Sequence, residues 1–524
     1  MKRILCLFLA LTVLSGLCGC RKNPEPELSH QEEPVAGKQE HLKISLLYSS
    51  GDSLNPYATN SLLNRQLSAL LFEPLVRVNS RFEADYRLAE TVSLDANTCT
   101  AVLKNTVFTD GSPVTADDVV YSFQLAKSSA EYGAMLTEFQ SASAVDGRTV
   151  SFRLTRYDPY GINLLEFPIM KAGSEKRVDE DGVVLPPIGC GRYVADGKAT
   201  LKRNENYYGG KSGIATVELI NAPDKESVSH YVEVGAADLY FTDLSDGNIV
   251  RMSGKRTEVN LNQLVYIGIN SASSGLSERY LRYAVSSALD RAELCKTAYY
   301  NNAVPAQGFY HPDFAPTKAV QTVKKSADLQ IAIENLGKVG YNNADGNGLP
   351  CNANGQHLSL TLLVNNDNPS RLSAARMIAA QLRQAGIEIT LQERDYASYL
   401  AAVSANQFQL YLGEIKILNN MDLSPLTVAG GSAAFGVGAA AEVPPETAVE
   451  ESTETAEEKP ATVGELINGF YGGTKSVSDL AGALLTEMPA IPVCFRKGLL
   501  FYSEKLEAVG TATPSDLYCS MNLF

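Results

Sequence analysis

The sequence predicts an α/β protein whose core is divided among two or three lobes. Its 524 residues are too many for one small hydrophobic core, because long chains split into domains of about 100–200 residues. Residues 358–392 read as strand, helix and strand, which is the pattern of a βαβ crossover and predicts a parallel sheet. A hydrophobic content of 45% with 20% charged residues is ordinary for a globular protein.

The bulk composition argues against one class of partner and limits the make-up of any binding site. The formal net charge is −14 and the chain contains no strongly basic stretch, so we expect no nucleic-acid partner. There is no tryptophan, whereas there are 25 tyrosines. Any aromatic ligand surface must therefore consist of Tyr and Phe.

Residues 1–20 predict a lipoprotein signal peptide with a lipobox. Basic Lys2 and Arg3 precede an apolar run, residues 4–17, that is short for a membrane-spanning helix. The segment Leu17–Cys20 ("LCGC") resembles a bacterial lipobox, in which the final cysteine is diacylated and becomes the new N-terminus. Two acyl chains suffice for stable anchoring. We expect the protein on the outer face of the cytoplasmic membrane, or in the periplasm if the cell has an outer membrane.

Two polar segments interrupt the globular pattern. Residues 21–42 are rich in Pro and Glu and lack apolar periodicity, which predicts a disordered spacer. Residues 436–462 ("GVGAAAEVPPETAVEESTETAEEKPAT") contain small and acidic residues with almost no large apolar side chain. Because a globular pattern resumes afterwards, we interpret this segment as a flexible acidic insertion within a domain.

The stretch "FTDGSPVTADDVVYSF", residues 108–123, raises the question whether its three aspartates form a metal or acid–base site. Asp110-Gly111 is a tight-turn dipeptide, and Thr115 stands where a helix N-cap would. Asp118 lies three residues later, as in an acidic capping box, and first-turn aspartates face the positive end of the helix dipole. We therefore predict structural roles for these aspartates.

Three further segments have recognisable local patterns. From Ser277 onward, apolar residues fall on one face of a predicted helix. The segment "NNADGNG" at residues 342–348 lacks the first and last ligands of a calcium loop and predicts a hairpin turn. Within residues 358–392, Ser370 is the predicted cap of a helix that ends at Gly386.

The sequence contains no motif of a common enzyme or metal site. Apart from the cysteines of residues 1–20, the chain has six scattered cysteines without a C-x-x-C pair, which leaves disulfides and buried thiols both open. We find no nucleophile elbow, no His-Glu-x-x-His, no Walker loop and no dinucleotide fingerprint. We expect neither an enzyme nor a metal or other cofactor.

An ordered series of segments resembles the family 5 extracellular solute-binding proteins, the oligopeptide- and dipeptide-binding components of ABC importers. The series covers roughly residues 43–524. Its pieces are "LNPYATN" at Leu54, "LLFEPLVRVN", "VFTDGSPVTADDVVYSF", "IGCGRYV" at Ile188, "LKRNENYYGG" at Leu201, "VEVGAADLYF" at Val232, "IGINSASSGLSERYLRYAVSSALDR" at Ile267 and "MPAIPVCF" at Met488.

The resemblance implies a periplasmic-binding-protein-like class II fold, with two lobes, a hinge and an inserted subdomain. It places the first lobe at residues 43–63, 188–266 and 496–524, the inserted subdomain at 64–187, and the second lobe at 267–495. Closure around a ligand would occur by bending at two crossings between the lobes. The implied hinge residues are Gly268, Asn270 and Pro492.

The resemblance also implies binding residues. The loop after the first strand, which pairs with the ligand backbone in peptide-binding relatives, corresponds here to Thr59, Asn60 and Ser61. An acidic side chain of the second lobe would pair with a peptide's ammonium, and either Glu414 or Asp422 could take that role. The remaining implied ligand-binding residues are Tyr411, Gly413 and Phe495.

The predicted function is capture of a solute, a peptide by majority usage of the family, for a membrane permease with its ATPases. We expect a monomer. Nickel, haem, opine or sugar import by the same fold is an alternative cargo assignment, because the tryptophan-rich pattern common near residues 408–426 of peptide-binding relatives is absent. A surface sensor, an adhesin or a peptide-capturing chaperone is the alternative of another class.

Overall fold

The structure is a computed structural model that describes residues 42–245, 252–273, 275–437, 463–506 and 511–519. The predicted signal peptide with Cys20 lies outside the described residues. So do the predicted spacer up to residue 41 and the acidic insertion from residue 438 onward. Across the part of the chain that the structure describes, no helix has the length and hydropathy needed to cross a bilayer.

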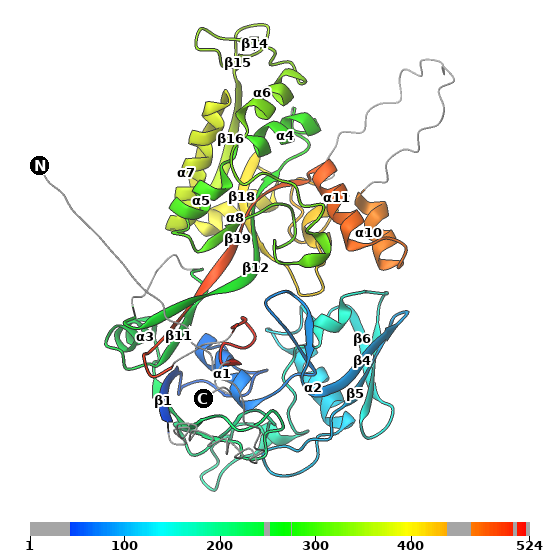
Figure 1. The fold of residues 1–524 in the computed structure, drawn as a ribbon, viewed down its shortest axis with the longest axis vertical. Coiled ribbons are helices and arrows are strands. Elements are labelled where there is room, and N and C mark those ends of the chain that lie inside the picture. The colour runs from blue at the N-terminus through cyan, green and yellow to red at the C-terminus, as the bar shows by residue number, and fades with distance from the viewer. Residues whose placement is uncertain (1–41, 246–251, 274, 438–462, 507–510, 520–524) are drawn as a thin grey trace, which may run out of the picture. The chain divides into compact units, whose positions relative to one another are not determined.

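One large mixed sheet runs through the body, and two of its strands are shared by both lobes. Neighbouring strands follow the order β17, β16, β18, β12, β19, β11, β1, β10, β9 and β8, with β13 beside β19. The shared strands are β12 (Lys255–Ile269) and β19 (Ala490–Tyr502), which pair antiparallel. Figure 1 shows this pair as the long ribbon that joins the second lobe to the first.

The first lobe contains one end of this sheet and the helices that cover it. Its core combines residues far apart in sequence, among them Leu46, Leu67, Val217 and Leu500. Its elements are β1 (Leu42–Tyr48), α1 (Leu62–Leu71), β8 (Tyr193–Ala195), β9 (Thr200–Arg203), β10 (Ile214–Asn221), α3 (Lys225–Glu233) and β11 (Leu239–Thr242).

The inserted subdomain is a separate four-stranded antiparallel sheet packed on α2, with a small hairpin, β2–β3, beside it. Its core includes Phe123, Phe139, Phe152 and Phe167, whose rings meet edge to face. Its elements are β2 (Val76–Val78), β3 (Ala84–Tyr86), β4 (Ala89–Asp95), β5 (Thr98–Leu103), α2 (Ala116–Ser128), β6 (Phe139–Ala144), β7 (Thr149–Leu154) and the 3-10 turns η1 (Gly161–Leu164) and η2 (Ser174–Lys176).

The second lobe packs helices on both faces of the other end of the large sheet. Alternate residues of β12 point to two cores, because Val265 and Ile267 enter one cluster and Leu264 and Tyr266 the other. Its elements are α4 (Arg279–Ser287), α5 (Arg291–Thr297), β13 (Ala303–Pro305), η3 (Ala315–Thr317), α6 (Leu329–Gly337), β14 (Asn343–Ala344), β15 (Pro350–Cys351), β16 (Leu358–Asn365), α7 (Pro369–Gln384), β17 (Ile387–Arg394), α8 (Tyr396–Ser404), β18 (Leu410–Lys416), α9 (Ser424–Thr427), α10 (Val463–Tyr471) and α11 (Val477–Glu487).

Helix α1 packs in the first-lobe core. Its buried residues join that core, and the predicted boundary at residue 64 falls inside this helix. The core of the inserted subdomain includes Leu75 and residues that follow it.

The predicted βαβ crossover is confirmed, whereas the predicted cap of its helix is wrong. β16 and β17 pair in parallel, and α7 connects them. The cap is Asn368, whose side-chain oxygen accepts a hydrogen bond from the backbone nitrogen of Arg371 at 3.0 Å. Pro369 takes the first helical position, where a missing N–H costs nothing, and this moves the start two residues ahead of Ser370.

The structural interpretation of residues 108–123 is confirmed. Thr115 and Asp118 form a capping box at the start of α2, with the Thr115 backbone nitrogen 2.9 Å from a carboxylate oxygen of Asp118. Asp110 accepts a bond from its neighbour Ser112 and pairs with Lys171 at 2.6 Å. The predicted hairpin near residue 342 is β14–β15. The six cysteines among the described residues are free thiols, five of them buried.

Candidate functional site

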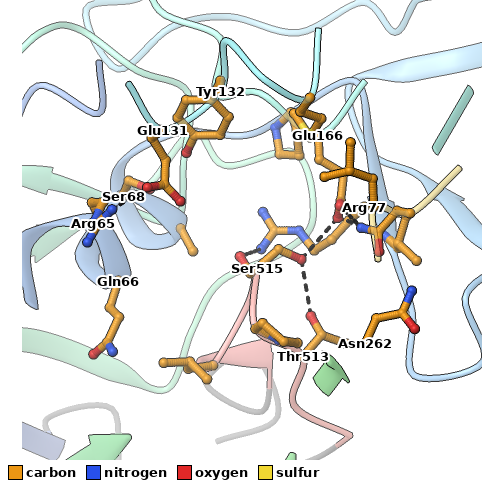
Figure 2. A pocket seen from close by; sticks show the side chains of 18 of the residues that line it. Arg65, Gln66, Ser68, Arg77, Glu131, Tyr132, Glu166, Asn262, Thr513 and Ser515 are labelled. Atoms are coloured by element: carbon orange, nitrogen blue, oxygen red, sulfur yellow. Dashed lines mark hydrogen bonds and ion pairs between the residues drawn. The ribbon is translucent and has the colours of Figure 1, made fainter. Parts of the chain in front are cut away.

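A cavity of about 390 Å³ lies where the first lobe, the inserted subdomain and the second lobe meet. Helix α1, the segment 131–135 of the subdomain and the C-terminal segment 512–517 form much of its wall, and residues 416–419 of the second lobe close the remaining side. Figure 2 shows Arg65 and Gln66 of α1 on one side of the cavity and Asn262 of β12 on the other. A concave site at the junction of domains is where small ligands usually bind.

Buried ion pairs hold the cavity wall where the first lobe meets the inserted subdomain. Arg77 bonds to Asp516 at 2.8 Å and to Glu73 at 3.3 Å, and Arg192 bonds to Asp516 at 2.5 Å. Burial by itself would raise the pKa of Asp516, but Arg77 and Arg192 outweigh it and hold the pKa below its usual range. The network ties the C-terminal segment and Arg192 of the first lobe to Arg77 and Glu73 at the start of the inserted subdomain.

Glu166 joins the three parts of the body at the cavity. Its carboxylate accepts hydrogen bonds from the Val78 backbone nitrogen at 2.7 Å, from the Ser515 hydroxyl at 3.0 Å and from the side-chain amide of Asn419. Burial raises the pKa of Glu166 despite these bonds. The side chain therefore connects the subdomain both to the C-terminal segment and to the second lobe.

Four side chains that line the cavity have a buried polar atom without a partner among the described residues. They are three donors, the amide nitrogen of Gln66 and the Nε atoms of Arg65 and Arg77, and one acceptor, the amide oxygen of Asn262. Buried polar atoms are nearly always hydrogen-bonded, so unpaired ones beside a cavity indicate that another molecule completes them. The cavity therefore presents both hydrogen-bond donors and a hydrogen-bond acceptor to a bound molecule.

Residues 417–424 of the second lobe, which we call the docking loop, rest on the inserted subdomain. Asn163 donates to the Asn419 carbonyl at 3.0 Å, and Asn420 donates to the Asp158 carboxylate at 2.8 Å. Arg156 pairs with Asp422 at 3.2 Å. All these contacts involve side chains, so they can break without unfolding a strand.

An apolar contact accompanies the docking loop. Phe82, at the tip of the β2–β3 hairpin, enters the second lobe between His311, with ring centroids 5.0 Å apart, and Phe314 at 6.4 Å. Its φ of +65° is unusual for a bulky residue and costs of the order of 1–3 kcal/mol. The surrounding second-lobe core holds it there.

The structure places Thr59, Asn60 and Ser61 directly before α1, but their groups are already engaged. The Asp52 carboxylate accepts from the Thr59 hydroxyl at 2.9 Å and from the backbone nitrogens of Asn60 and Ser61 at 2.7 and 2.6 Å. Burial opposes ionisation of Asp52, but these bonds prevail and lower its pKa. The loop therefore positions α1, and it is this helix, and not Thr59, Asn60 or Ser61, that lines the cavity.

Tyr411, Gly413 and Phe495 lie in the second-lobe core and do not line this cavity. The Tyr411 hydroxyl is 3.0 Å from the Tyr266 hydroxyl, and Phe495 is fully buried. A Cβ at Gly413 would lie 2.7 Å from the Tyr411 ring. In this conformation these residues pack against one another and contact no open cleft.

The two acidic candidates are both paired with arginine. Glu414 binds Arg371 at 2.8 Å and Arg496 at 2.7 Å, one arginine on each carboxylate oxygen. Asp422 binds Arg156 and is part of the docking loop. An ammonium group would have to displace an arginine from either carboxylate.

The predicted hinge residues all lie within the second lobe. Gly268 pairs with Tyr411 and Ala490, and a Cβ there would come within 1.9 Å of the Tyr411 ring, so close packing explains the glycine. Asn270 donates to the Phe408 carbonyl, and the Pro492 carbonyl accepts from Arg291. The strand pair is irregular at two points: the register shifts between Asn260 and Leu264, and again between Val265 and Tyr266, opposite Pro492.

No sequence motif marks the residues that line the cavity. Arg65, Gln66 and Asn262 sit in no recognisable motif, and the segments 131–135 and 512–517 reach the cavity only through the fold. Arg65 pairs with Glu131 and so joins α1 to the subdomain. The one usable signal was position, because α1 follows the predicted loop at Thr59–Ser61.

A model of the bacterial extracellular solute-binding proteins, family 5 Middle, matches residues 83–433. The chain belongs to this family. It is therefore a solute-binding protein that works outside the cytoplasm, and the prediction that it is not an enzyme is confirmed.

Individual relatives agree with this family and differ in their named solutes. A Brucella ovis protein provisionally named an ABC transporter peptide-binding protein is 24% identical over 384 residues, 68% of this chain and 70% of the relative. The nickel-binding periplasmic protein of Escherichia coli is 24% identical over 379 residues, 68% of this chain and 71% of the relative. The solved unliganded, open form of MppA, a periplasmic murein tripeptide binding protein, matches with a TM-score of 0.71 at 19% identity, covering 92% of this chain and 97% of MppA. This likeness confirms the predicted fold class.

Proposed function

We propose that the chain is the substrate-binding component of an ABC importer and that it captures a peptide in the cavity between its lobes. The observation that carries the proposal is the cavity itself, whose wall comes from all three parts of the body. A ligand there would contact both lobes at once, so binding and closure would be one equilibrium. A membrane permease with its ATPases would then take the solute from the closed form.

The chemistry of the cavity supports a peptide more than a bare metal ion. A peptide backbone presents N–H donors and C=O acceptors, and the unpaired atoms of Asn262 and Gln66 complement one of each. None of the described residues that line the cavity is a histidine or a cysteine, the side chains that hold nickel best. No group of three potential metal-binding side chains gathers anywhere in the described ranges.

We also propose where the body bends. β12 places Leu261, Asn262 and Gln263 opposite Arg496 of β19, which is an irregularity of the bulge type. Its place between the two lobes favours this segment, which we call the hinge bulge, as the pivot, whereas the second register shift, opposite Pro492, lies within the second lobe. Bulges interrupt the ladder, so backbone angles can change there with little loss of hydrogen bonding.

Lipid anchoring through Cys20 is part of the proposal and rests on the sequence alone. Mass spectrometry of the protein from its native membranes is expected to find a diacylated N-terminal cysteine. Replacing Cys20 by serine is expected to release the protein from the membrane without changing solute binding. Retention of the serine variant in the membrane would contradict the anchor.

The capture proposal is tested by filling the cavity. Ala134 is exposed on the cavity wall, so Ala134→Trp adds bulk without disturbing a core. Ala397, exposed on α8 away from the cavity, provides the matched control Ala397→Trp. The solute that co-purifies with the wild-type protein, identified by native mass spectrometry, is expected to bind the control normally and the Ala134 variant at least tenfold more weakly. Equal binding of the solute to both variants would contradict the site. A separate experiment distinguishes an importer from a sensor: deletion of the gene should abolish uptake of the solute if the protein serves an importer.

A further inference from the structure

A second, much smaller cavity lies beside the hinge bulge and is lined in part by Arg496 of β19. It has a volume of about 20 Å³ and is lined by Tyr299, Ser370, Arg371, Glu414 and Arg496, with Leu244 of the first lobe at its edge. It shares no residue with the solute cavity. A space of this size holds one water molecule or one small ion.

The charged side chains of this cavity leave one positive charge uncompensated. Arg371 and Arg496 are two cations, and Glu414 is the single carboxylate between them. Each oxygen of Glu414 is already bonded to one arginine, at 2.8 and 2.7 Å. A buried surplus cation is costly unless an anion accompanies it.

A buried hydroxyl at the same cavity has no partner. Tyr299 is 7% exposed, and its hydroxyl makes no hydrogen bond to any described residue. Burial raises the pKa of Tyr299 well above its usual value, Cys494 and Glu414 add to the effect, and Arg371 and Arg496 oppose it without reversing it, so the hydroxyl stays protonated and can donate. Tyr299 therefore supplies an unused donor beside two arginines.

The start of α7 contributes a favourable field. This helix has 16 residues, and Ser370 and Arg371 in its first turn line the cavity. The N-terminus of a helix carries a partial positive charge that attracts anions. The field alone would not define a site, but it adds to the surplus cation and the unused hydroxyl.

We propose that this cavity binds a small monovalent inorganic anion, with chloride as the physiological candidate. The anion accepts the hydrogen bond of Tyr299 and neutralises the surplus charge of Arg371 and Arg496. A volume of about 20 Å³ accommodates a halide and excludes larger anions such as gluconate.

Two residues of the small cavity also form hydrogen bonds to the first lobe. Arg496 donates its other nitrogen to the Asp243 carbonyl of the first lobe, and Asn368, the cap of α7, donates to the Ser245 carbonyl at 2.9 Å. A bound anion holds Arg496 and the start of α7 in the positions that make these contacts. Chloride therefore stabilises the arrangement of the two lobes at the hinge bulge.

The first test compares melting temperatures in chloride, bromide and gluconate at equal ionic strength. Chloride and bromide are expected to raise the melting temperature above that in gluconate by mass action. Tyr299→Phe removes only the donor, so it is expected to weaken chloride binding about tenfold and to shrink the difference between salts. Tyr310→Phe is the matched control, because Tyr310 has an equally unpartnered buried hydroxyl but does not line this cavity.

The second test locates the anion in crystals of the whole protein grown in bromide. The anomalous map is expected to show a peak between Tyr299 and Arg371, absent from crystals of the Tyr299→Phe variant at low bromide. Three results would each overturn the proposal. They are identical melting temperatures in all three salts, equal loss of chloride binding in the two tyrosine variants, and an ordered water as the only occupant of the cavity. Because the solute cavity is separate, failure here leaves the capture proposal standing.

Discussion

Two of the contacts that hold the second lobe to the rest of the body differ in kind. At the strand crossing, β12 and β19 pass continuously between the lobes and are bonded to each other by backbone groups. At the docking loop, residues 417–424 meet the inserted subdomain through bonds in which at least one partner is a side chain, among them those of Asn419, Asn420 and Asp422. The first contact cannot separate without unfolding, whereas the second can release and re-form.

The difference indicates how the cavity can open. It lies between these two contacts, so release of the docking loop with rotation at the hinge bulge would expose it. The ion pairs that join the first lobe to the inserted subdomain would stay in place. Changes to the ion pairs of the cavity wall should therefore lower the stability of the whole fold, whereas changes to the docking loop should shift only the balance between open and closed forms.

The largest effect is expected from Asp516→Ala in the fixed wall. The change leaves Arg77 and Arg192 buried without their shared carboxylate, which costs about 4 kcal/mol of unfolding free energy. Urea denaturation followed by circular dichroism measures the loss. Asp95→Ala, at an exposed strand end, is the control and should change stability by less than about 0.5 kcal/mol. A small loss for Asp516→Ala would show that the wall is not held as described.

Phe82→Ala removes the apolar part of the docking contact. The ring packs against His311 and Phe314 and is 7% exposed, so its loss costs about 3 kcal/mol in the docked state. The population of the open form is expected to rise, visible as a larger radius of gyration in small-angle X-ray scattering. Tyr86→Ala, exposed on the same hairpin, is expected to leave the scattering unchanged. Identical scattering from both variants would contradict this role of Phe82.

Asn420→Ala weakens the polar part of the same contact. The variant leaves the buried Asp158 carboxylate without its 2.8 Å bond, which costs about 2 kcal/mol. Because closure and binding are coupled, calorimetry with the co-purified solute should show affinity reduced by roughly tenfold or more. An unchanged affinity would contradict the coupling between the docking contact and closure of the lobes around the solute.

The smallest effect concerns pH. Burial raises the pKa of Asp158 to about 6, and the nearby negative charge of Asp422 adds to the shift, whereas Asn420, the Tyr160 backbone and Arg156 oppose it. The folded pKa is above that of the unfolded chain, so the unfolded state loses its proton first and stability falls as pH rises from about 4 through 6. Between pH 5 and 7 we expect a loss of about 1 kcal/mol. Asp158→Asn should flatten the profile, and a slope of the opposite sign would contradict the assignment.

Local patterns predicted the local structure well. The capping box of Thr115 and Asp118, the strand–helix–strand unit of residues 358–394 and the hairpin near residue 342 depend on neighbours in sequence, which a single sequence displays. Ser370 was placed wrongly as a cap because Asn368-Pro369 two residues earlier satisfies the same helix start better.

The site depends on contacts that the sequence does not display. Glu414 and Asp422 were alternative candidates to bind an ammonium group, but both carboxylates are paired with arginines that lie 43 or more residues away in sequence. Tyr411 and Phe495 looked like cleft aromatics, yet the second-lobe core uses both. Asn262 gained its place at the cavity from the bulge in β12, which no residue pattern marks.

The most direct test of the capture account is small-angle X-ray scattering of the solute-free protein, before and after addition of the solute that co-purifies with it. The account predicts a smaller radius of gyration on binding for the wild-type protein and for Ala397→Trp, and no change for Ala134→Trp. A solute that binds tightly to the wild-type protein while all three scattering curves stay the same would contradict closure of the lobes around it.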